Sequence, residues 1–401
     1  MSPKTIYIHG YGVEGQASAR HFKHKYPDAS LVIIDQSKIT TPHRYLNEEN
    51  ALKHFENTHL AKEPILFIRS AGIPPHNKVI AWLDDHEIKH QTALSYWLGH
   101  EAPKNTITVT GSKGKSSISS LIAHLLKAKL IGNIGISPFD IKWYTDDIAV
   151  IEASSYQLHD LQYPSKFHFI SNIYKEHTDW HGSPDLYKDA KYRPFTLGSK
   201  GLTEIALQDV IHNFPDLDPT LDRNEPFYTN LRTALACIKT TGLCDFEQLL
   251  ANLPTLLEGY TSLPHRQEII AVIKGITWMD DALATIPEAT LLALKGVSPC
   301  YPHIHLLIGG KDRGQDYTLF LKDLSRFKNV SLYAFADVKN RLIDQKTIIC
   351  DDFKDAILKA KRTAQKGDLI LFSPAAASEH PFQNYKERAT LFKKYAEQEK
   401  I

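Results

Sequence analysis

The chain has 401 residues, which is too long for one ordinary hydrophobic core and predicts two or three domains. It is 42% hydrophobic and 23% charged with a formal net charge of +1, so its charge gives no reason to expect a nucleic acid or an anionic membrane as partner. No apolar run approaches the roughly 20 residues that span a bilayer, and the opening MSPKTIYIHG lacks a signal-peptide layout. Four scattered cysteines suggest neither a disulfide framework nor a zinc site. We therefore expect a cytoplasmic protein.

Strand-like runs alternate with helical stretches along the chain, a pattern typical of mainly parallel sheets covered by helices. The sequence predicts a first unit with strands at 5–10, 30–35 and 64–69 and a helix at 11–22. A polar stretch at 99–105 marks its end. A second unit follows, with strands at 106–111, 147–154 and 167–173 and a helix at 116–128. After a second boundary at 258–266, a third unit has strands at 275–281, 303–310, 330–336 and 367–374. Residues 195–226 give no clear pattern.

The segment TVTGSKGKSS, residues 108–117, carries the strongest chemical signal. A strand that feeds glycines into a helix gathers backbone N–H groups and the positive end of the helix dipole at one point. Lys115 can then reach the outer phosphates of a nucleotide, and Ser116 can bind Mg²⁺. Val109 stands where the full motif has a glycine, and the alternative is a helix N-terminus without special function. We predict that the loop binds the phosphates of ATP or GTP.

Three further residues extend this prediction. Glu152 ends an apolar strand, where open α/β sheets bind ligands and where a carboxylate suits a hard cation. His177 follows the end of a strand, and Lys191 lies in a helical stretch fourteen residues later. Taken singly, such a histidine is usually a satisfied polar residue and such a lysine is usually solvated.

A second glycine motif lies near the N-terminus. GYGVEG, with Gly10, Gly12 and Gly15, precedes Asp35 by the spacing of a dinucleotide-binding fingerprint. By itself the motif favours NAD. Beside a phosphate loop, it is better interpreted as the UDP site of a nucleotide-sugar substrate, and the alternative is a glycine turn that caps a helix without binding a ligand.

Six segments occur in one order along the chain: TGSKGKSS, IEASSYQL, NIYKEHTDWHGSPDLYKDAK, LPHRQE, LLIGGKDRGQDY and LFSPAAASEHPFQNYKERATLFKK. Together they resemble the Mur ligase family, and the last two are most similar to its branch that adds D-glutamate to UDP-N-acetylmuramoyl-L-alanine. The resemblance implies an ATP-dependent ligase of peptidoglycan synthesis that forms an acyl phosphate. It also implies three domains: a Rossmann-like UDP-substrate domain at 1–100, a P-loop ATPase-type domain at 101–262, and a Rossmann-like amino-acid-binding domain at 263–401.

The resemblance assigns roles to individual residues. The implied catalytic residues are Lys115, Glu152, His177 and Lys191. The implied ATP-binding residues are Gly111, Ser112, Lys113, Gly114, Lys115, Ser116, Ser117, Asn230, Arg266 and Asp281. Those implied for the UDP substrate are Val13, Glu14, Asp35, Gln36, Ser37, Ser70, Gly72, Asn133, Ser154 and Gln157. Those implied for the amino acid are Thr285, Arg313, Ser378 and Tyr385.

The resemblance also implies cofactors and partners. Two Mg²⁺ ions would be held by Ser116, Glu152, His177 and Lys191, the last as a carbamate. The substrates would be ATP, UDP-N-acetylmuramoyl-L-alanine and D-glutamate. We expect a monomer that uses neither nucleic acid nor a membrane.

Several residues depart from the family pattern. Leu283 stands where the family commonly has lysine, and Phe227 where it usually has asparagine. Glu14 and Glu379 would repel anionic substrates if they faced them. Lys113 either compensates for the missing lysine or points to the surface. The alternatives are a Mur or folylpolyglutamate-type ligase with another acceptor or amino acid, a non-catalytic nucleotide-sugar-binding relative and, more distantly, an NAD-dependent oxidoreductase.

Overall fold

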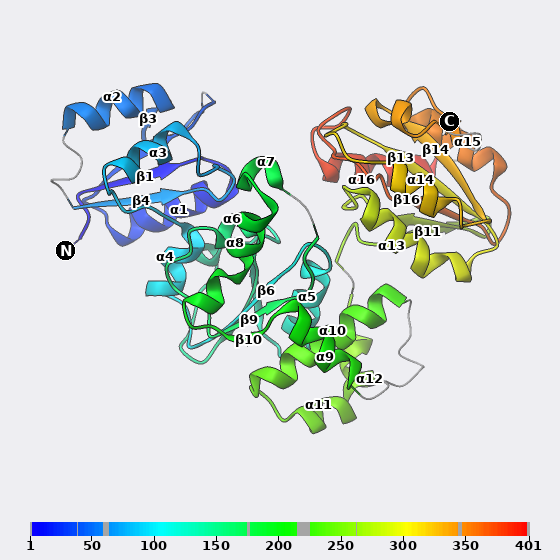
Figure 1. The fold of residues 1–401 in the computed structure, drawn as a ribbon, viewed down its shortest axis with the longest axis horizontal. Coiled ribbons are helices and arrows are strands. Elements are labelled where there is room, and N and C mark those ends of the chain that lie inside the picture. The colour runs from blue at the N-terminus through cyan, green and yellow to red at the C-terminus, as the bar shows by residue number, and fades with distance from the viewer. Residues whose placement is uncertain are drawn as a thin grey trace. The chain divides into compact units, whose positions relative to one another are not determined.

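The computed structural model describes the chain in two compact units (Figure 1). The first comprises Met1–Asp216 and Asn230–Tyr260, and the second comprises Leu217–Thr229 and Thr261–Ile401. The described residues are all those outside 1, 38, 59–63, 175–176, 215–224, 262, 344–346 and 399–401, without the side chains of 178, 179, 225 and 226. The first unit contains two five-stranded sheets and the second contains one six-stranded sheet.

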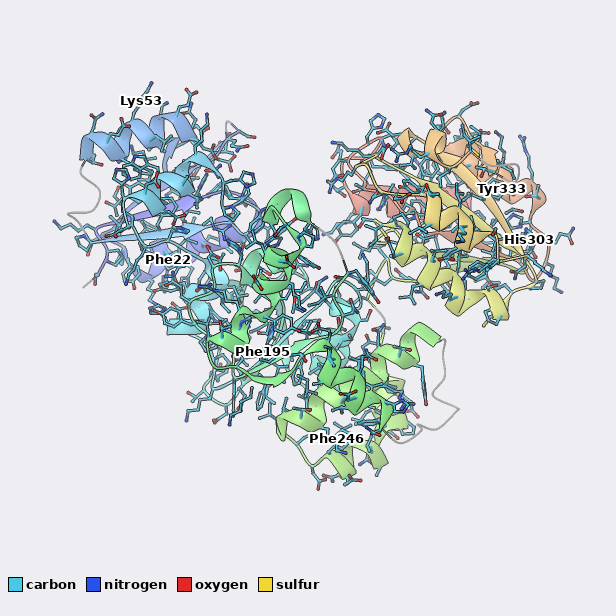
Figure 2. All side chains as sticks on the ribbon, viewed as in Figure 1. Phe22, Lys53, Phe195, Phe246, His303 and Tyr333 are labelled. Carbon is cyan, nitrogen blue, oxygen red and sulfur yellow. The ribbon has the colours of Figure 1, made fainter. Side chains whose placement is uncertain are left out.

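The N-terminal sheet has the strand order β3-β2-β1-β4-β5 and is parallel throughout. Its strands are β1 (Thr5–His9), β2 (Ser30–Ile34), β3 (Arg44–Leu46), β4 (Ile65–Arg69) and β5 (Gln91–Thr92). Its helices are α1 (Val13–Lys25), α2 (Glu48–Thr58), α3 (Lys78–Asp85) and α4 (Ala93–His100). Tyr7 packs with Phe67 in one buried cluster, and Ile6 packs with Phe22, which is labelled in Figure 2, in another. Because apolar clusters cover both faces, the central strands are continuous apolar runs.

The central sheet has the order β10-β9-β6-β8-β7 and is also parallel. Its strands are β6 (Asn105–Thr110), β7 (Lys129–Gly132), β8 (Ile148–Glu152), β9 (Phe167–Ile170) and β10 (Lys200–Leu202). The helical segments are α5 (Lys115–Leu125), η2 (Pro138–Asp140), α6 (Ser155–Leu158), α7 (Thr178–His181), α8 (Pro184–Thr196), α9 (Glu204–His212), α10 (Glu225–Thr241), α11 (Phe246–Ala251) and α12 (Leu253–Glu258). The carboxyl ends of β6, β8 and β9 therefore meet at one edge of the sheet.

The sheet of the second unit has the order β11-β12-β16-β13-β14-β15, and only β11 is antiparallel to its neighbour among the described strands. Its strands are β11 (Glu268–Ile273), β12 (Ile276–Asp280), β13 (Ile304–Gly309), β14 (Val330–Phe335), β15 (Thr347–Ile349) and β16 (Leu369–Phe372). The helical segments are α13 (Pro287–Val297), η4 (Ser298–Cys300), α14 (Thr318–Leu324), η5 (Asp337–Arg341), α15 (Phe353–Thr363) and α16 (Tyr385–Glu397). Buried clusters around Tyr333 and Leu306 cover its two faces (Figure 2).

These sheets confirm the predicted fold class, three mainly parallel α/β sheets, and each predicted strand is present to within a few residues at its ends. The strands that the sequence did not reveal are short or lie at sheet edges, as β3, β5 and β15 do. The predicted boundary at 99–105 overlaps the end of α4. The three domain ranges stay predictions. Within the described residues, no helix combines the length and apolarity needed to cross a membrane.

Candidate active site

The loop between β6 and α5 is shaped by the strand beside it. Gly111 has a φ of +155°, and a Cβ on it would lie 2.0 Å from Ser171 Oγ, so only glycine fits there. The Lys113 amide donates to Asn172 Oδ1 at 2.8 Å, and the Lys113 carbonyl accepts from Ser171 Oγ at 2.9 Å. Ser171 and Asn172 follow β9 directly. Neighbouring strand ends therefore fix the backbone of the phosphate loop.

Two lysines converge on this loop. Lys115 Nζ donates to the Gly111 carbonyl at 2.9 Å, and Lys191 Nζ donates to the same carbonyl at 3.0 Å. Lys191, on α8, is 1% exposed and lies 4.8 Å from the centre of the Tyr187 ring. The His168 imidazole contacts the Lys191 carbonyl at 2.9 Å, and burial lowers the pKa of His168 to about 3. His168 is therefore neutral and adds no third positive charge.

Glu152 ends β8 beside the loop, in register with Val109 of β6. Its side chain is buried, and its Oε1 accepts a hydrogen bond from Asn133 Nδ2 at 2.9 Å. Its Oε2 is also buried and has no hydrogen-bond partner in the part of the chain that the structure describes. A buried carboxylate oxygen without a donor is costly, and a hard cation would stabilise it.

Aromatic side chains connect His177 to the loop between β6 and α5. Its Nδ1 lies 2.7 Å from the Tyr156 hydroxyl, and Tyr156 stacks on Trp180. The His177 ring is 6.1 Å from the Tyr187 ring, and the Tyr187 hydroxyl lies 2.8 Å from Ser112 Oγ of the loop. His177, Lys191 and Lys115 thus belong to one group of contacts around the loop, and Glu152 ends the strand paired with β6 at the same edge of the central sheet.

The other residues predicted for ATP in this unit lie on or beside the loop. Gly114 caps α5 in the left-handed conformation, and a Cβ on it would lie 2.9 Å from Asn230 Oδ1. Ser116 is buried in the first turn of α5, whereas Ser117 and Lys113 are half-buried. Asn230 therefore flanks the loop, and its role at the adenine stays a prediction.

The N-terminal glycine loop has a similar construction. Gly10 has a φ of +90°, and its carbonyl accepts a hydrogen bond from Ser70 Oγ, just after β4, at 3.0 Å. Asp35 accepts hydrogen bonds from the Tyr11 amide at 2.8 Å and from the Ser37 amide at 2.9 Å. Asp35, Ser37 and Ser70 therefore surround the start of α1.

Glu14 lies in the first turn of α1 and is half-buried. Burial raises the pKa of its carboxyl group, while hydrogen bonds from the Ala71 amide and the Gln157 side chain and attraction to Arg69 oppose that rise. The side chain is thus held against the segment after β4 and against α6. Sequence reasoning had left its direction open.

The remaining residues predicted for the UDP substrate have structural contacts or lie at the surface. Val13 is 68% exposed, and Gln36 is exposed near Glu48. The Gly72 carbonyl accepts from Trp180 Nε1 at 3.2 Å. Ser154 and Gln157 form a capping box at the start of α6. Asn133 is exposed, apart from its bond to Glu152.

In the second unit, Asp281 lies just after β12 and accepts a hydrogen bond from Ser373 Oγ at 2.7 Å. Burial raises the pKa of Asp281 to about 7, and the Ser373 bond and attraction to Arg266 moderate that rise. The two residues predicted for the nucleotide in this unit, Arg266 and Asp281, therefore interact.

The residues predicted for the amino acid lie in loops of the same unit. Arg313 forms an ion pair with Glu379 at 2.7 Å, and both side chains are about half exposed. Ser378 is buried, and Tyr385 begins α16 with its ring 6.0 Å from that of His265. The Thr285 carbonyl accepts from Gln315 Nε2 at 3.0 Å. Glu379 thus neutralises the cation expected to bind a carboxylate.

Comparison with known proteins places this geometry in a family. Residues 109–213 match the Mur ligase middle domain, and residues 265–376 match the Mur ligase glutamate ligase domain. UDP-N-acetylmuramoylalanine--D-glutamate ligase of Thermosipho africanus is 30% identical over 425 residues, which cover 96% of each chain. The chain belongs to the Mur ligase family. It is a ligase of that family, as predicted.

Other relatives of this Mur ligase differ in the amino acid that they are named for. UDP-N-acetylmuramoyl-L-alanine--L-glutamate ligase of a Micromonospora species is 28% identical over 442 residues, covering 97% of this chain and 95% of the relative. Among solved structures, the MurF ligase of Thermotoga maritima in complex with ADP has a TM-score of 0.57 at 15% identity, covering 98% of this chain and 95% of that one. This structural likeness supports the fold.

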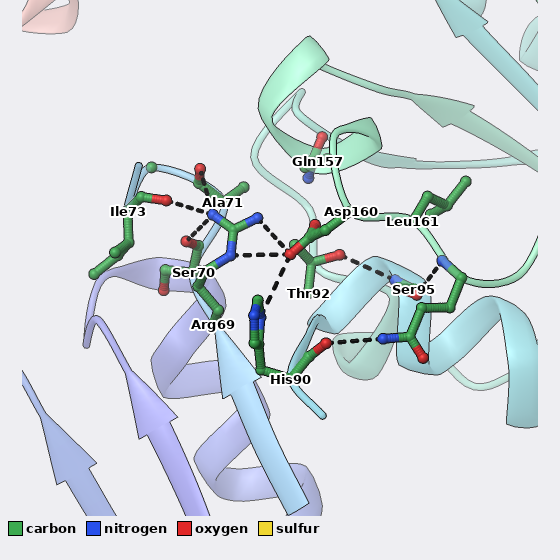
Figure 3. Close-up of polar contacts among 12 residues, drawn as sticks. Arg69, Ser70, Ala71, Ile73, His90, Thr92, Ser95, Gln157, Asp160 and Leu161 are labelled. Carbon is green, nitrogen blue, oxygen red and sulfur yellow. Dashed lines mark hydrogen bonds and ion pairs between the residues drawn. The ribbon is translucent and has the colours of Figure 1, made fainter. Parts of the chain in front are cut away.

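Sequence reasoning about this Mur ligase missed a buried charge cluster in the first unit. Arg69, at the end of β4, pairs with Asp160, after α6, and His90 lies beside them (Figure 3). The only local signal was an arginine at the end of an apolar strand. The partner lies 91 residues away along the chain, so no local pattern could reveal it.

In the second unit, Asp280 and Arg388 were missed. Asp280 Oδ2 lies 2.7 Å from Nδ1 of His265, and His265 directly precedes Arg266 in the sequence. Arg388, buried on α16, donates to the carbonyls of Ala376 at 3.0 Å and Ala282 at 2.6 Å. It thereby joins the loop after β16 to the loop after β12, where Ser378 and Thr285 lie. Its place three residues after Tyr385, on one helix face, was a usable signal.

Proposed function

We propose that this Mur ligase joins glutamate to UDP-N-acetylmuramoyl-L-alanine and converts ATP to ADP and phosphate. It would act as a cytoplasmic monomer in peptidoglycan precursor synthesis. The observation that carries the proposal is the position of Lys115 Nζ at the Gly111 carbonyl, just after β6. On the neighbouring strand β8, Glu152 Oε2 is buried without a hydrogen-bond partner among the described residues. A carboxylate and a triphosphate repel each other, so a site that brings them together needs concentrated positive charge. The names of the relatives supply the substrates.

In the first step, an oxygen of the substrate carboxylate attacks the γ-phosphorus of ATP. The bond from that phosphorus to the β–γ bridging oxygen breaks, which leaves ADP and an acyl phosphate. Lys115 and the backbone N–H groups at the start of α5 would stabilise the charge on the transferring phosphoryl group. The glutamate amine then attacks the acyl carbon, a proton leaves the nitrogen, and inorganic phosphate departs.

The residues at this edge fit Mg²⁺. Glu152 Oε2 is a buried oxygen donor, the Ser116 hydroxyl is buried in the first turn of α5, and His177 lies within the same group. These residues, with Lys191 as a carbamate, are proposed to hold two Mg²⁺ ions. Bound Mg²⁺ would neutralise charge on the phosphates and on the acceptor carboxylate.

Carbamylation of Lys191 is part of the proposal. The Lys191 ammonium group would lose two protons as a bond forms between Nζ and the carbon of carbon dioxide, which turns a cation into a bidentate anion. With ¹³C-labelled bicarbonate, a carbamate resonance is expected in the wild-type protein and not in Lys191→Ala. A wild-type spectrum identical to that of the variant would contradict the modification.

Whether the enzyme uses D-glutamate or L-glutamate is the second question about its specificity. Relatives over nearly the full chain are named for D-glutamate and for L-glutamate, so L-glutamate is the second candidate. The test is ADP formation with UDP-N-acetylmuramoyl-L-alanine and a panel of D- and L-amino acids. We expect turnover with D-glutamate. Turnover with L-glutamate alone would favour the second candidate, and no turnover with any amino acid would reject the ligase assignment.

A further inference from the structure

A buried arginine lies beneath the loop at residues 70–74. Arg69 is 1% exposed, and its Nη1 donates to the carbonyls of Ser70 and Ala71, each at 3.4 Å, and to that of Ile73 (Figure 3). Three carbonyl groups of one short loop therefore face one guanidinium group. The flat, forked shape of arginine suits such a set of acceptors, whereas lysine offers a single point.

The same guanidinium group also contacts the segment that follows α6 in the central part of the first unit. Its Nε and Nη2 contact Asp160 Oδ2 at 3.1 and 2.8 Å, and His90 Nδ1 lies 3.7 Å from that oxygen. Asp160 follows α6, which starts three residues after Glu152. The ion pair therefore ties the loop at 70–74 to the segment that leaves the carboxyl end of β8.

Two further contacts hold the loop from the same side. Trp180 Nε1, on α7, donates to the Gly72 carbonyl, and the Ala71 amide donates to Glu14, which also accepts from Gln157 on α6. The loop is thus held by helices α6 and α7 of the central part as well as by helix α1 of the N-terminal part.

A buried ion pair contributes little net stability, because desolvation offsets much of the attraction between the charges. A gain in stability therefore does not account for this ion pair, whereas its position between the loop at 70–74 and the segment after α6 does. We propose that Arg69 and Asp160 are positioning residues that set the affinity for the nucleotide-sugar substrate. The inference rests on the proposed function and on the prediction from the sequence that Ser70 and Gly72 of this loop bind the UDP substrate.

The test compares Asp160→Asn and Arg69→Lys with wild-type enzyme by steady-state kinetics. Misplacing the loop should raise KM for UDP-N-acetylmuramoyl-L-alanine by about tenfold and leave KM for ATP and glutamate within about twofold. A purely structural role would lower the melting temperature and the active fraction without separating the three KM values.

The chain provides a matched control. Arg20 on α1 pairs with Asp140 in η2 at 2.8 Å and so also joins the N-terminal sheet to the central part, but these side chains are 63% and 40% exposed. Asp140→Asn should change no KM by more than about twofold, because exposed ion pairs contribute little.

A double variant, Arg69→Met with Asp160→Leu, removes both charges together in case the single variants fail to fold. Its melting temperature should fall, because three loop carbonyls lose their donor, and the folded enzyme should show the same selective rise in KM. Unchanged KM values in the folded variants, or equal rises for all three substrates, would overturn this inference alone. A wild-type enzyme that neither binds UDP in calorimetry nor turns over would overturn the proposed function and this inference with it.

Discussion

Two crevices in the first unit share one backbone plan and differ in charge. In each, a strand ends at a glycine with positive φ, Gly10 or Gly111, and a helix follows. In each, that glycine packs against a serine that follows the neighbouring strand, Ser70 or Ser171. The central crevice presents the ammonium group of Lys115, whereas the N-terminal one presents the carboxylates of Glu14 and Asp35.

The difference in charge matches the proposed role of each crevice toward a bound phosphate group. Transfer of a phosphoryl group requires positive charge where negative charge develops, and in the proposed function Lys115 at the central loop would provide it. A pyrophosphate that is only held can be bound by backbone N–H groups and a helix N-terminus. In the N-terminal crevice the nearby cation, Arg69, already pairs with Asp160 and donates to loop carbonyls. If the proposed function holds, one backbone plan would serve chemistry in one place and positioning in the other.

The largest expected effect separates the two crevices directly. Lys115→Ala should lower kcat by at least about a hundredfold, because one preorganised charge in a desolvated site contributes that much. Binding of UDP measured by calorimetry should stay as in wild type. Lys127→Ala, which changes an exposed lysine just beyond the same helix, is the control. Near-normal turnover of Lys115→Ala would show that this loop does not bind the transferring phosphate.

Glu152→Gln tests the metal site of the central crevice. Loss of the anionic oxygen should raise the Mg²⁺ concentration for half-maximal activity by about tenfold or more, because hard cations prefer carboxylates. Titration of activity with Mg²⁺ measures the shift. Asp146→Asn, at an exposed acid just before β8, should leave the titration unchanged. An unshifted curve for Glu152→Gln would remove this residue from the metal site.

Gly10→Ala tests the backbone of the N-terminal crevice. A Cβ at Gly10 would lie 2.7 Å from Ser70 Oγ, and the φ of +90° is strained for alanine. We expect a loss of about 1–3 kcal/mol in the free energy of unfolding and a rise in KM for the nucleotide sugar. Gly12→Ala is the control, since its φ is −69° and a Cβ there meets no atom within 4 Å in the described structure. Equal unfolding curves for the two variants would contradict the steric argument.

Glu14→Gln should give the smallest effect and the opposite sign. Removing a carboxylate beside the proposed pyrophosphate site should lower KM for the nucleotide sugar by about threefold at pH 8. The gain should shrink at a lower pH, because burial raises the pKa of Glu14 and the carboxyl group loses its charge as the pH falls toward that pKa. Glu49→Gln, at an exposed acid in the first turn of α2, should change KM at neither pH. A higher KM in Glu14→Gln would mean that this side chain binds the substrate.

Much of the fold was predictable because its signals are local. The apolar strand before Gly111 and the serine-rich helix after it mark β6, of six residues, and α5, of eleven. The short strand β3 was missed because its three residues carry too little pattern. The antiparallel edge strand β11 was missed although five of its six residues, EIIAVI, are apolar. Leu283 and Phe227 depart from the family pattern, and nothing in the structure explains either.

The sequence alone determined the phosphate loop, since a strand, two glycines, a lysine and a helix start are consecutive and their geometry follows from the backbone. The tertiary structure decided which side chains complete the crevices. Asn172 meets Lys113 across 59 residues only because β9 lies beside β6. Asp160 meets Arg69 across 91 residues, and Glu14 turns toward Ala71 and Gln157. Such partners depend on strand order and packing, which bring distant segments together without leaving a periodic pattern in either one.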